Sequence, residues 1–211
     1  MNNNIETDYS KSFNEYVYNA IPANSVCLDV GCSTGNLGRK LITDKRCKVD
    51  GIDLSSRALE IAKTVGYQKT YNLDLNYFNA AQLDTKKYDV IIFADVLEHT
   101  ISPETILHQI ELLLKENGKI IISIPNVAFV LNRIKLLLGH WDYKEYGTLD
   151  RTHLRFYTKG SSVNLVKSCG YEIEKFIPYF QFGIPQRFQG IIKLFPSLLA
   201  YQFLIIAVVK K

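Results

Sequence analysis

The residue types that can bind a small molecule gather first in the segment VCLDVGCSTGNLG, residues 26–38. An apolar run there ends at Asp29 and breaks into a loop with glycines at positions 31, 35 and 38. Glycine tolerates positive φ and has no side chain to exclude a ligand. A glycine loop that leads into a helix brings bare backbone and a helix N-terminus to a bound molecule. We therefore predict a ligand-binding loop over these residues.

The spacing of the glycines disfavours two common phosphate-binding loops. The dinucleotide fingerprint is G-x-G-x-x-G, but Ser33 stands where its second glycine belongs and the next glycine is Gly35. The chain contains no G-x-x-x-x-G-K-[ST] segment, so a P-loop is excluded. A pyrophosphate ligand is therefore disfavoured, and a nicotinamide-dependent oxidoreductase remains only as an alternative function.

The elements that position this loop alternate between strand and helix. Apolar segments predict five strands, at residues 26–30, 48–54, 70–75, 88–96 and 119–124. Segments with Ser, Pro or Gly at their ends predict helices between them, at 36–42, 57–65 and 102–115. This alternation predicts an open α/β sheet, mostly parallel and doubly wound, with helices on both faces.

Acidic residues end successive strands of this predicted sheet. Asp29, Asp53, Asp74 and Asp95 all fall at or near a strand end. Ligands of doubly wound sheets bind outside the carboxyl ends of the strands. The four acids together therefore predict a polar ligand-binding edge.

The arrangement Asp29-x-Gly31-x-Ser33-x-Gly35 resembles motif I, D/E-x-G-x-G-x-G, of the class I S-adenosylmethionine-dependent methyltransferases, with serine replacing the middle glycine. In that family the acid ending the second strand accepts both ribose hydroxyls, and Asp53 matches it. A carboxylate can take two charge-assisted hydrogen bonds from vicinal hydroxyls. The resemblance therefore implies S-adenosylmethionine as the cofactor.

Two further segments extend the resemblance. Asp74 and Leu75 match the acid that the family places near the adenine amino group, and residues 89–100 (DVIIFADVLEHT) resemble the motif IV region of the ubiquinone-biosynthesis-like, small-molecule branch. Backbone of Ala94 and Asp95 lines the cofactor in that branch. The cofactor-binding residues implied are Asp29, Gly31, Cys32, Ser33, Gly35, Asp53, Leu54, Asp74, Leu75, Ala94, Asp95 and His99.

The family fold also accounts for the C-terminal part of the chain. It implies a Rossmann-like seven-stranded sheet in which strands one to six are parallel and the seventh is antiparallel, between the fifth and sixth. Residues 171–177 and 202–209 match these last two strands. We expect a single domain, with an N-terminal helical segment (1–24), a cofactor-binding half (25–125) and an acceptor-side segment with the final strand pair (126–211).

The acceptor side is expected at residues 141–158, WDYKEYGTLDRTHLRFYT, where rings and charges suit a sugar or another polar metabolite. This block resembles one in bacterial methyltransferases associated with cell-surface polysaccharide synthesis, and its layout is distantly similar to MetW-like methyltransferases. We predict His153 and His99 as catalytic residues, with His153 as the general base; a histidine that anchors the loop is the alternative. The predicted substrate-binding residues are Trp141, Tyr146, Arg151 and Arg155.

The two arginines have an alternative role, since they can pair with acidic residues of the same segment. A net charge of +4 is too weak to indicate a nucleic-acid partner. The spacing of the four histidines predicts no metal site. The cysteines form no C-x-x-C pair and the polar N-terminus has no apolar run, so a cytoplasmic location is expected.

No apolar run is long enough to span a bilayer; the C-terminal run, residues 203–209, is far too short. The apolar segment 184–199 carries Arg187 and Lys193. Such a segment more often covers the core or forms a homodimer contact, and a peripheral membrane contact is the alternative. The sequence as a whole predicts a methyltransferase that acts on a hydroxyl of a small molecule. A non-catalytic module that binds the cofactor is the second alternative.

Overall fold

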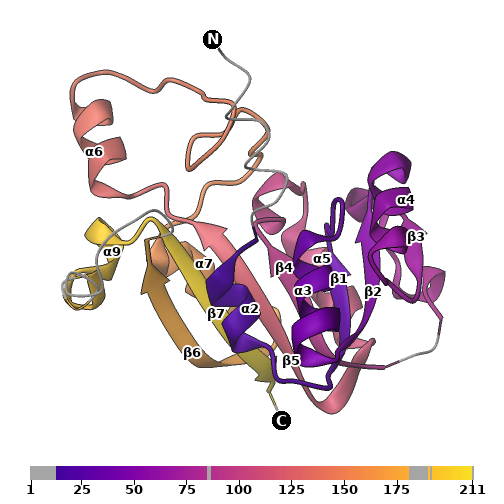
Figure 1. The fold of residues 1–211 in the computed structure, drawn as a ribbon. Coiled ribbons are helices and arrows are strands. Elements are labelled where there is room, and N and C mark those ends of the chain that lie inside the picture. Colours follow the sequence, from indigo (N-terminus) through magenta and orange to yellow (C-terminus); the bar gives the residue numbers. More distant parts are fainter. Residues whose placement is uncertain (1–12, 85–86, 181–189, 191, 211) are drawn as a thin grey trace.

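The computed structural model describes residues 13–84, 87–180, 190 and 192–210. A seven-stranded sheet with the order β3-β2-β1-β4-β5-β7-β6 forms its centre (Figure 1). The strands are β1 (Val26–Val30), β2 (Lys48–Asp53), β3 (Thr70–Asn72), β4 (Tyr88–Ala94), β5 (Leu114–Pro125), β6 (Tyr171–Tyr179) and β7 (Gln202–Val209). β1 to β5 pair in parallel, and β7 runs antiparallel between β5 and β6. The predicted fold class is confirmed.

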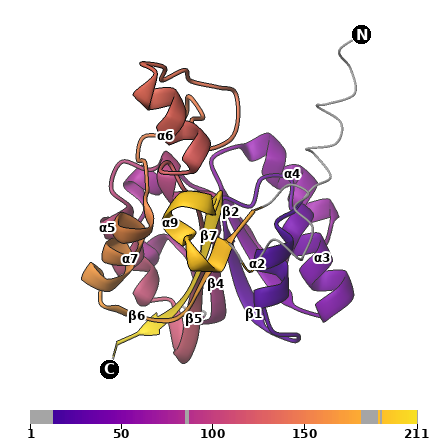
Figure 2. The ribbon, with the colours of Figure 1, turned by 90° about the vertical axis from the view of Figure 1, so that its left-hand side faces the viewer.

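Helices cover both faces of the sheet (Figure 2). One face packs against α2 (Glu15–Ala20), α3 (Asn36–Lys45) and α4 (Ser56–Thr64), and the other against α5 (Pro103–Glu111) and α7 (Lys159–Ser168). The central strand β4 is buried on both faces, because Ile91 and Phe93 belong to one core cluster while Val90 and Ile92 belong to the other. Strands buried on both faces are continuously apolar, so the sheet is a rigid support for the loops at its edge.

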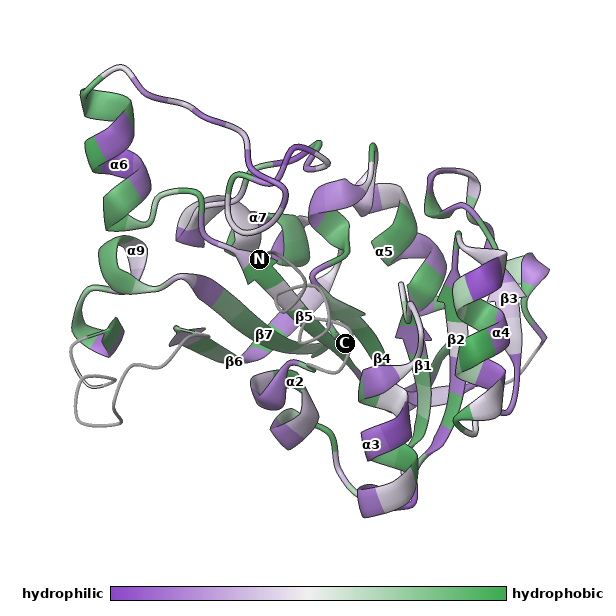
Figure 3. Cartoon of the chain, turned by 45° about the horizontal axis from the view of Figure 1, so that its top comes forward, coloured by the Kyte–Doolittle hydropathy of each residue, from purple (hydrophilic) through white to green (hydrophobic). Residues whose placement is uncertain are grey.

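The carboxyl ends of β3 and β4 lead into the short helices η1 (Leu75–Tyr77) and η3 (Leu97–His99), and η2 (Ala80–Gln82) lies between η1 and β4 in the chain. After β5 the chain leaves the two helical layers and forms α6 (Val130–Leu137), which stands apart from the sheet (Figure 1). Figure 3 shows that α6 contains both hydrophobic and hydrophilic residues, whereas the central strands are mostly hydrophobic. The last helix, α9 (Pro196–Leu199), precedes β7.

Several element boundaries differ from those predicted. The helix expected at 102–115 ends at Glu111, because Leu113 and Leu114 are buried in the core and the Leu113 carbonyl accepts a hydrogen bond from Tyr88 N at 2.9 Å. β5 accordingly starts at Leu114, and its register with β4 shifts before Lys119. The strand expected at 70–75 ends at Asn72, and the rest of that segment begins η1.

Among the described residues, no helix is long and apolar enough to cross a membrane. Much of the apolar segment 184–199 lies outside the described residues. Its described part exposes Leu194 and Phe195, and Ile192 packs in a small cluster with Ala200 and Phe203. Helix α2 lies within residues 13–24, in the part of the chain where a helical N-terminal segment is expected.

Candidate active site

The glycine loop joins β1 to α3 in the left-handed conformation that its sequence requires. Gly31 has φ +71°, Ser33 has φ +49°, and Gly35 has φ +81° as the N-cap of α3. A Cβ on Gly31 would lie 2.6 Å from Val96 Cγ2. The loop backbone therefore runs close to the chain that follows β4, and a larger residue at position 31 would clash there.

Contacts with Tyr67 account for three further glycines and for the role of Asp29. Its ring lies against Gly35, Gly38 and Gly51, each of which has no room for a Cβ. The Tyr67 hydroxyl donates a hydrogen bond of 2.6 Å to Asp29, which is almost fully buried. Burial raises the pKa of Asp29 to about 7, although the Tyr67 hydrogen bond opposes this rise. Asp29 thus supports the glycine loop through its hydrogen bond with Tyr67.

Asp53 ties the loop to the end of β2. One carboxylate oxygen accepts a hydrogen bond from Ser33 N and the other from Ser55 N, both at 2.8 Å. Each oxygen of a carboxylate has a second lone pair. Asp53 can therefore hold the loop and still accept hydrogen bonds from a ligand in front of it.

A cavity of about 270 Å³ opens in front of this loop. Its wall contains seven of the predicted cofactor residues, namely Gly31, Asp53, Leu54, Asp74, Leu75, Asp95 and His99. Asp29, Cys32, Ser33, Gly35 and Ala94 are not part of the wall. Four residues that the sequence did not single out complete it, namely Leu73, Asn76, Val96 and Thr100.

Asp74 and Asn76 shape the far end of this cavity. The Asp74 carboxylate accepts hydrogen bonds from Asn76 N at 2.9 Å and from the Asn76 side-chain amide at 3.0 Å. The Asn76 side-chain oxygen in turn accepts one from Ile101 N at 2.8 Å. Because these bonds link η1 to the segment after η3, the cavity has a fixed wall on both sides.

Asp95 stands between this cavity and a second one. It has φ +58°, which is uncommon outside glycine and clusters at functional sites. Its carboxylate accepts hydrogen bonds from the Ser123 hydroxyl and, at 2.8 Å, from the Gln202 amide. Burial raises the pKa of Asp95, and these two hydrogen bonds partly oppose that rise. Asp95 is thereby held in one orientation by β5 and β7.

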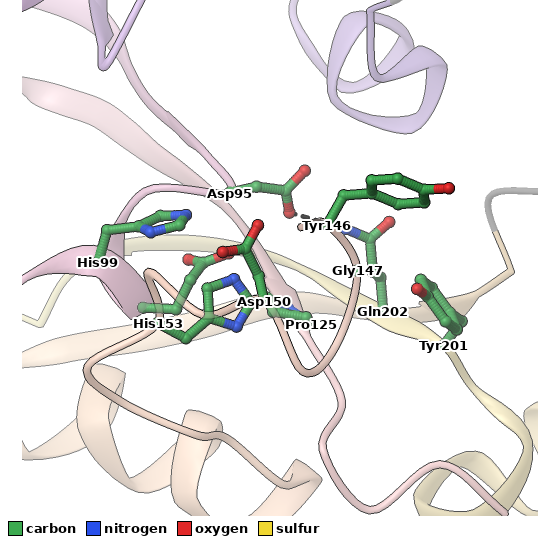
Figure 4. A pocket seen from close by; sticks show the side chains of 10 residues that line it. Asp95, His99, Pro125, Tyr146, Gly147, Asp150, His153, Tyr201 and Gln202 are labelled. Atoms are coloured by element: carbon green, nitrogen blue, oxygen red, sulfur yellow. Dashed lines mark hydrogen bonds between the residues drawn. The ribbon is translucent and has the colours of Figure 1, made fainter. Parts of the chain in front are cut away.

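The second cavity, of about 170 Å³, lies between the strand ends and the loop 141–158 (Figure 4). It shares Asp95 and His99 with the first cavity. Two of the residues predicted for the acceptor side, Tyr146 and His153, line it. The other residues of its wall are Glu98, Pro125, Gly147, Asp150, Tyr201 and Gln202.

The remaining predicted substrate-binding residues have other contacts. Arg151 pairs with Glu145 at 2.5 Å, as the alternative reading of the sequence held. The Arg155 guanidinium donates to the Ile101 carbonyl. Trp141 packs edge-to-face on Phe156, with ring centroids 5.6 Å apart. These three side chains fasten the loop, and none of them is part of the cavity wall.

Backbone hydrogen bonds hold the loop against η3. Leu154 N and Arg155 N both donate to the Glu98 carbonyl, at 2.8 and 3.0 Å. This clamp places His153 beside His99, with ring centroids 4.7 Å apart. Burial and the neighbouring His99 lower the pKa of His153, so its imidazole is neutral near neutral pH.

His99 is oriented by Thr152. Its Nδ1 lies 3.1 Å from the Thr152 hydroxyl oxygen and 3.3 Å from the Thr152 carbonyl oxygen. The Thr152 hydroxyl donates its proton to Asp150 at 2.6 Å, so toward His99 it can only accept. Nδ1 therefore carries the proton, and Nε2 of the neutral ring keeps a free lone pair.

A family model of a methyltransferase domain matches residues 1–175 of the chain. The chain belongs to this methyltransferase family. The methyltransferase is 31% identical, over 161 residues, to a ubiquinone biosynthesis O-methyltransferase of Azoarcus sp., an alignment that covers 70% of this chain and 68% of the relative. A protein of the same name from Haemophilus ducreyi is 34% identical over 107 residues, but the alignment covers only 47% of this chain and 44% of that protein.

Solved methyltransferases share the fold at lower identity. An S-adenosylmethionine-dependent methyltransferase from Mesorhizobium loti superposes with a TM-score of 0.66 at 16% identity, covering 92% of this chain and 95% of that one. The 1,6-didemethyltoxoflavin-N1-methyltransferase of Burkholderia thailandensis, solved with S-adenosylhomocysteine bound, gives 0.58 at 14% identity, covering 90% and 72%. The assignment replaces the nicotinamide-dependent alternative, and S-adenosylmethionine is the cofactor.

The first cavity has the chemistry that this cofactor needs. Carboxylates of Asp53 and Asp74 are acceptors for hydroxyl and amino groups, while Leu54 and Leu75 provide apolar contacts for a flat base. Gly31 leaves free the space that a Cβ would fill. The residues that line the first cavity therefore fit S-adenosylmethionine.

Proposed function

We propose that this methyltransferase transfers the methyl group of S-adenosylmethionine to a hydroxyl of a small polar molecule, a sugar or a related metabolite. The observation that carries the proposal is the shared wall of the two cavities. A donor in the first and an acceptor in the second would meet at Asp95 and His99. Transfer requires reacting atoms about 3–3.5 Å apart and in line, and adjoining cavities are compatible with that alignment.

On the donor side, we assign the ribose hydroxyls to Asp53 and the adenine amino group to Asp74, because these acceptors lie in the wall of the same cavity. The cofactor supplies a methyl group already activated by its positive sulfur. Asp95 and His99 would then border the methyl group, and Asp95 adds a fixed dipole or charge at that point. Asp29, Cys32, Ser33 and Gly35 act through the shape of the loop.

On the acceptor side, several polar side chains contribute to the wall. Asp150, His153 and Tyr146 surround the space in which a hydroxyl would meet the methyl group (Figure 4). A hydroxyl must lose its proton as its oxygen is methylated. We propose that the imidazoles of His99 and His153 promote this loss, since both line the second cavity and His99 also lines the first.

A labelled-product experiment tests the proposal. The protein is incubated with S-adenosylmethionine carrying a deuterated methyl group and with a panel of acceptors, which includes nucleotide sugars, glycan precursors and catechol-like phenols. We expect one sugar-type acceptor to gain the labelled methyl group, detected by mass spectrometry, together with stoichiometric S-adenosylhomocysteine. Exclusive labelling of the phenols would contradict the acceptor class. Cofactor binding without transfer to any acceptor would favour the non-catalytic module.

We also propose that α6 and α9 rest on an anionic lipid surface. Arg133 ties the two helices together through a hydrogen bond of 3.2 Å to the Ser197 carbonyl. Apolar side chains around this link are exposed, namely Leu131, Ile134, Leu136, Leu137, Leu138, Leu194 and Phe195. Lys135 and Lys193 lie among them. Apolar surface interspersed with cations is typical of segments that lie in a membrane interface.

A further inference from the structure

Three side chains from two separate parts of the chain, η3 and the loop 141–158, form a cluster in the wall of the second cavity. Glu98, His99 and His153 each offer one ligand atom, and these atoms lie within 4.8 Å of one another. The linear spacing of the histidines predicted no metal site because His153 lies far from the other two in sequence. The backbone clamp on the Glu98 carbonyl brings it to them.

The Glu98 carboxylate is unusual within the described structure. Its residue is 1% exposed, and neither carboxylate oxygen has a hydrogen-bond partner among the described residues. Nδ1 of His153, also buried, has none either. A buried polar atom without a partner costs roughly 1–3 kcal/mol, and more when it is charged. Unpartnered acceptors that converge in one place are a suitable arrangement for binding a cation.

His99 is also oriented in a way that suits cation binding. Its Nδ1–H is fixed by Thr152, whose hydroxyl donates in turn to Asp150, so Nε2 is the free acceptor. Histidines that bind metals usually donate their second nitrogen to such an oriented acceptor, which sets the tautomer and the ring direction. The Thr152–Asp150 pair therefore supplies the outer support that a metal-binding histidine needs.

We propose that Glu98, His99 and His153 bind a divalent cation of the Zn²⁺ type, with an open position that faces the second cavity. Two neutral imidazoles and one carboxylate are a donor set typical of catalytic zinc and related transition metals, which keep one or more positions for substrate or water. The cation would satisfy the Glu98 carboxylate and the lone pairs of both imidazoles. Asp150 and Tyr146 line the cavity onto which the open position faces.

The consequence for catalysis rests on the proposed function. The acceptor oxygen would take the open position, where the cation lowers the pKa of its hydroxyl. The bond from this oxygen to the methyl carbon forms as the sulfur–methyl bond breaks, and the hydroxyl proton passes to the Asp150 carboxylate or to water. His153 then promotes the reaction as a ligand, and not as the general base that the sequence predicted.

Metal binding can be measured without methyl transfer. The untagged full chain is stripped with a chelator, and Zn²⁺ binding is followed by calorimetry, with Co²⁺ as a spectroscopic probe of imidazole and carboxylate ligation. We expect one equivalent of Zn²⁺ to bind. Glu98→Gln, His99→Ala and His153→Ala should each weaken binding more than 100-fold. Thr152→Val should weaken it about 10–100-fold, since it removes the support of His99.

Two variants keep the test decisive. His108→Ala removes an exposed histidine on α5 and should leave Zn²⁺ affinity unchanged. Glu98→Gln should raise the melting temperature of the metal-free protein, because it replaces an unpartnered buried acid, and should abolish the further rise that Zn²⁺ causes in the wild type. Wild-type protein that binds no Zn²⁺, or a Glu98→Gln variant that binds it normally, would overturn the proposal. Cofactor affinity is measured separately, so failure of methyl transfer would leave a measured metal site intact.

Discussion

The buried Asp29–Tyr67 pair makes the stability of the fold depend on pH in a direction that one substitution can test. Asp29 is 2% exposed on β1 and accepts its hydrogen bond from the Tyr67 hydroxyl. Asp29→Asn keeps an oxygen that can accept this bond but cannot ionise. The comparison between the two proteins therefore isolates the cost of burying the charged carboxylate.

The magnitude follows from the difference between the two pKa values of Asp29. The folded protein holds its pKa at about 7, against 3.8 for an exposed aspartate. Each pH unit of that difference is worth about 1.4 kcal/mol, so the roughly three units amount to about 4 kcal/mol. The folded state keeps a proton that the unfolded chain has lost, so wild-type stability falls as pH rises from about 4 to about 7. The stability gained by Asp29→Asn should grow over the same window.

Urea unfolding at a series of pH values from about 4 to about 8 measures both free energies. We expect the difference, variant minus wild type, to rise by up to about 4 kcal/mol and to level off above pH 7. Asp89→Asn is the matched control. Its pKa is lowered, because hydrogen bonds from Lys115 and from Val26 N outweigh burial, so that variant should instead lose stability above pH 4. A difference in unfolding free energy between Asp29→Asn and the wild type that does not change with pH would contradict the raised pKa of buried Asp29.

Three further outcomes follow from the site and the surface. Asp53→Ala should weaken S-adenosylmethionine binding by about 1.5–3 kcal/mol in calorimetry, since it removes charge-assisted hydrogen bonds; unchanged affinity would remove Asp53 from the site. Gly31→Ala should abolish cofactor binding, because its Cβ meets Val96 and φ is positive, whereas Gly160→Ala in α7 should bind normally. Leu137→Glu, at a residue 86% exposed, should reduce sedimentation with anionic vesicles, whereas Leu112→Glu should not; equal sedimentation of all three proteins, or a loss of dimer instead, would contradict the lipid contact.

The sheet could be predicted because its signals are local. The apolar run of β4 and the acids at the strand ends lie in short segments, and each predicted strand exists at nearly the expected residues. Helix ends were less accurate. Residues 112–115 have helical propensity, but the burial of Leu113 and Leu114 against β4 decides their structure.

The interior of the site could not be predicted for the opposite reason. Tyr67 supports the glycine loop from a position 29 residues beyond Gly38, and no local pattern connects them. His153 lies near Glu98 because backbone hydrogen bonds from Leu154 and Arg155 hold the loop against the Glu98 carbonyl. Arg155 illustrates the same limit, because a charged side chain in a polar segment serves equally well as a ligand contact or as a fastener of the loop.

The central claim, that the two cavities are a donor and an acceptor site with a shared wall, is tested most directly by a crystal structure with S-adenosylhomocysteine. We expect the ribose hydroxyls on Asp53, the adenine beside Asp74 and Asn76, and the sulfur at the boundary formed by Asp95 and His99. A sulfur atom turned away from that boundary, or a ligand seated in the Tyr146–His153 cavity, would contradict it.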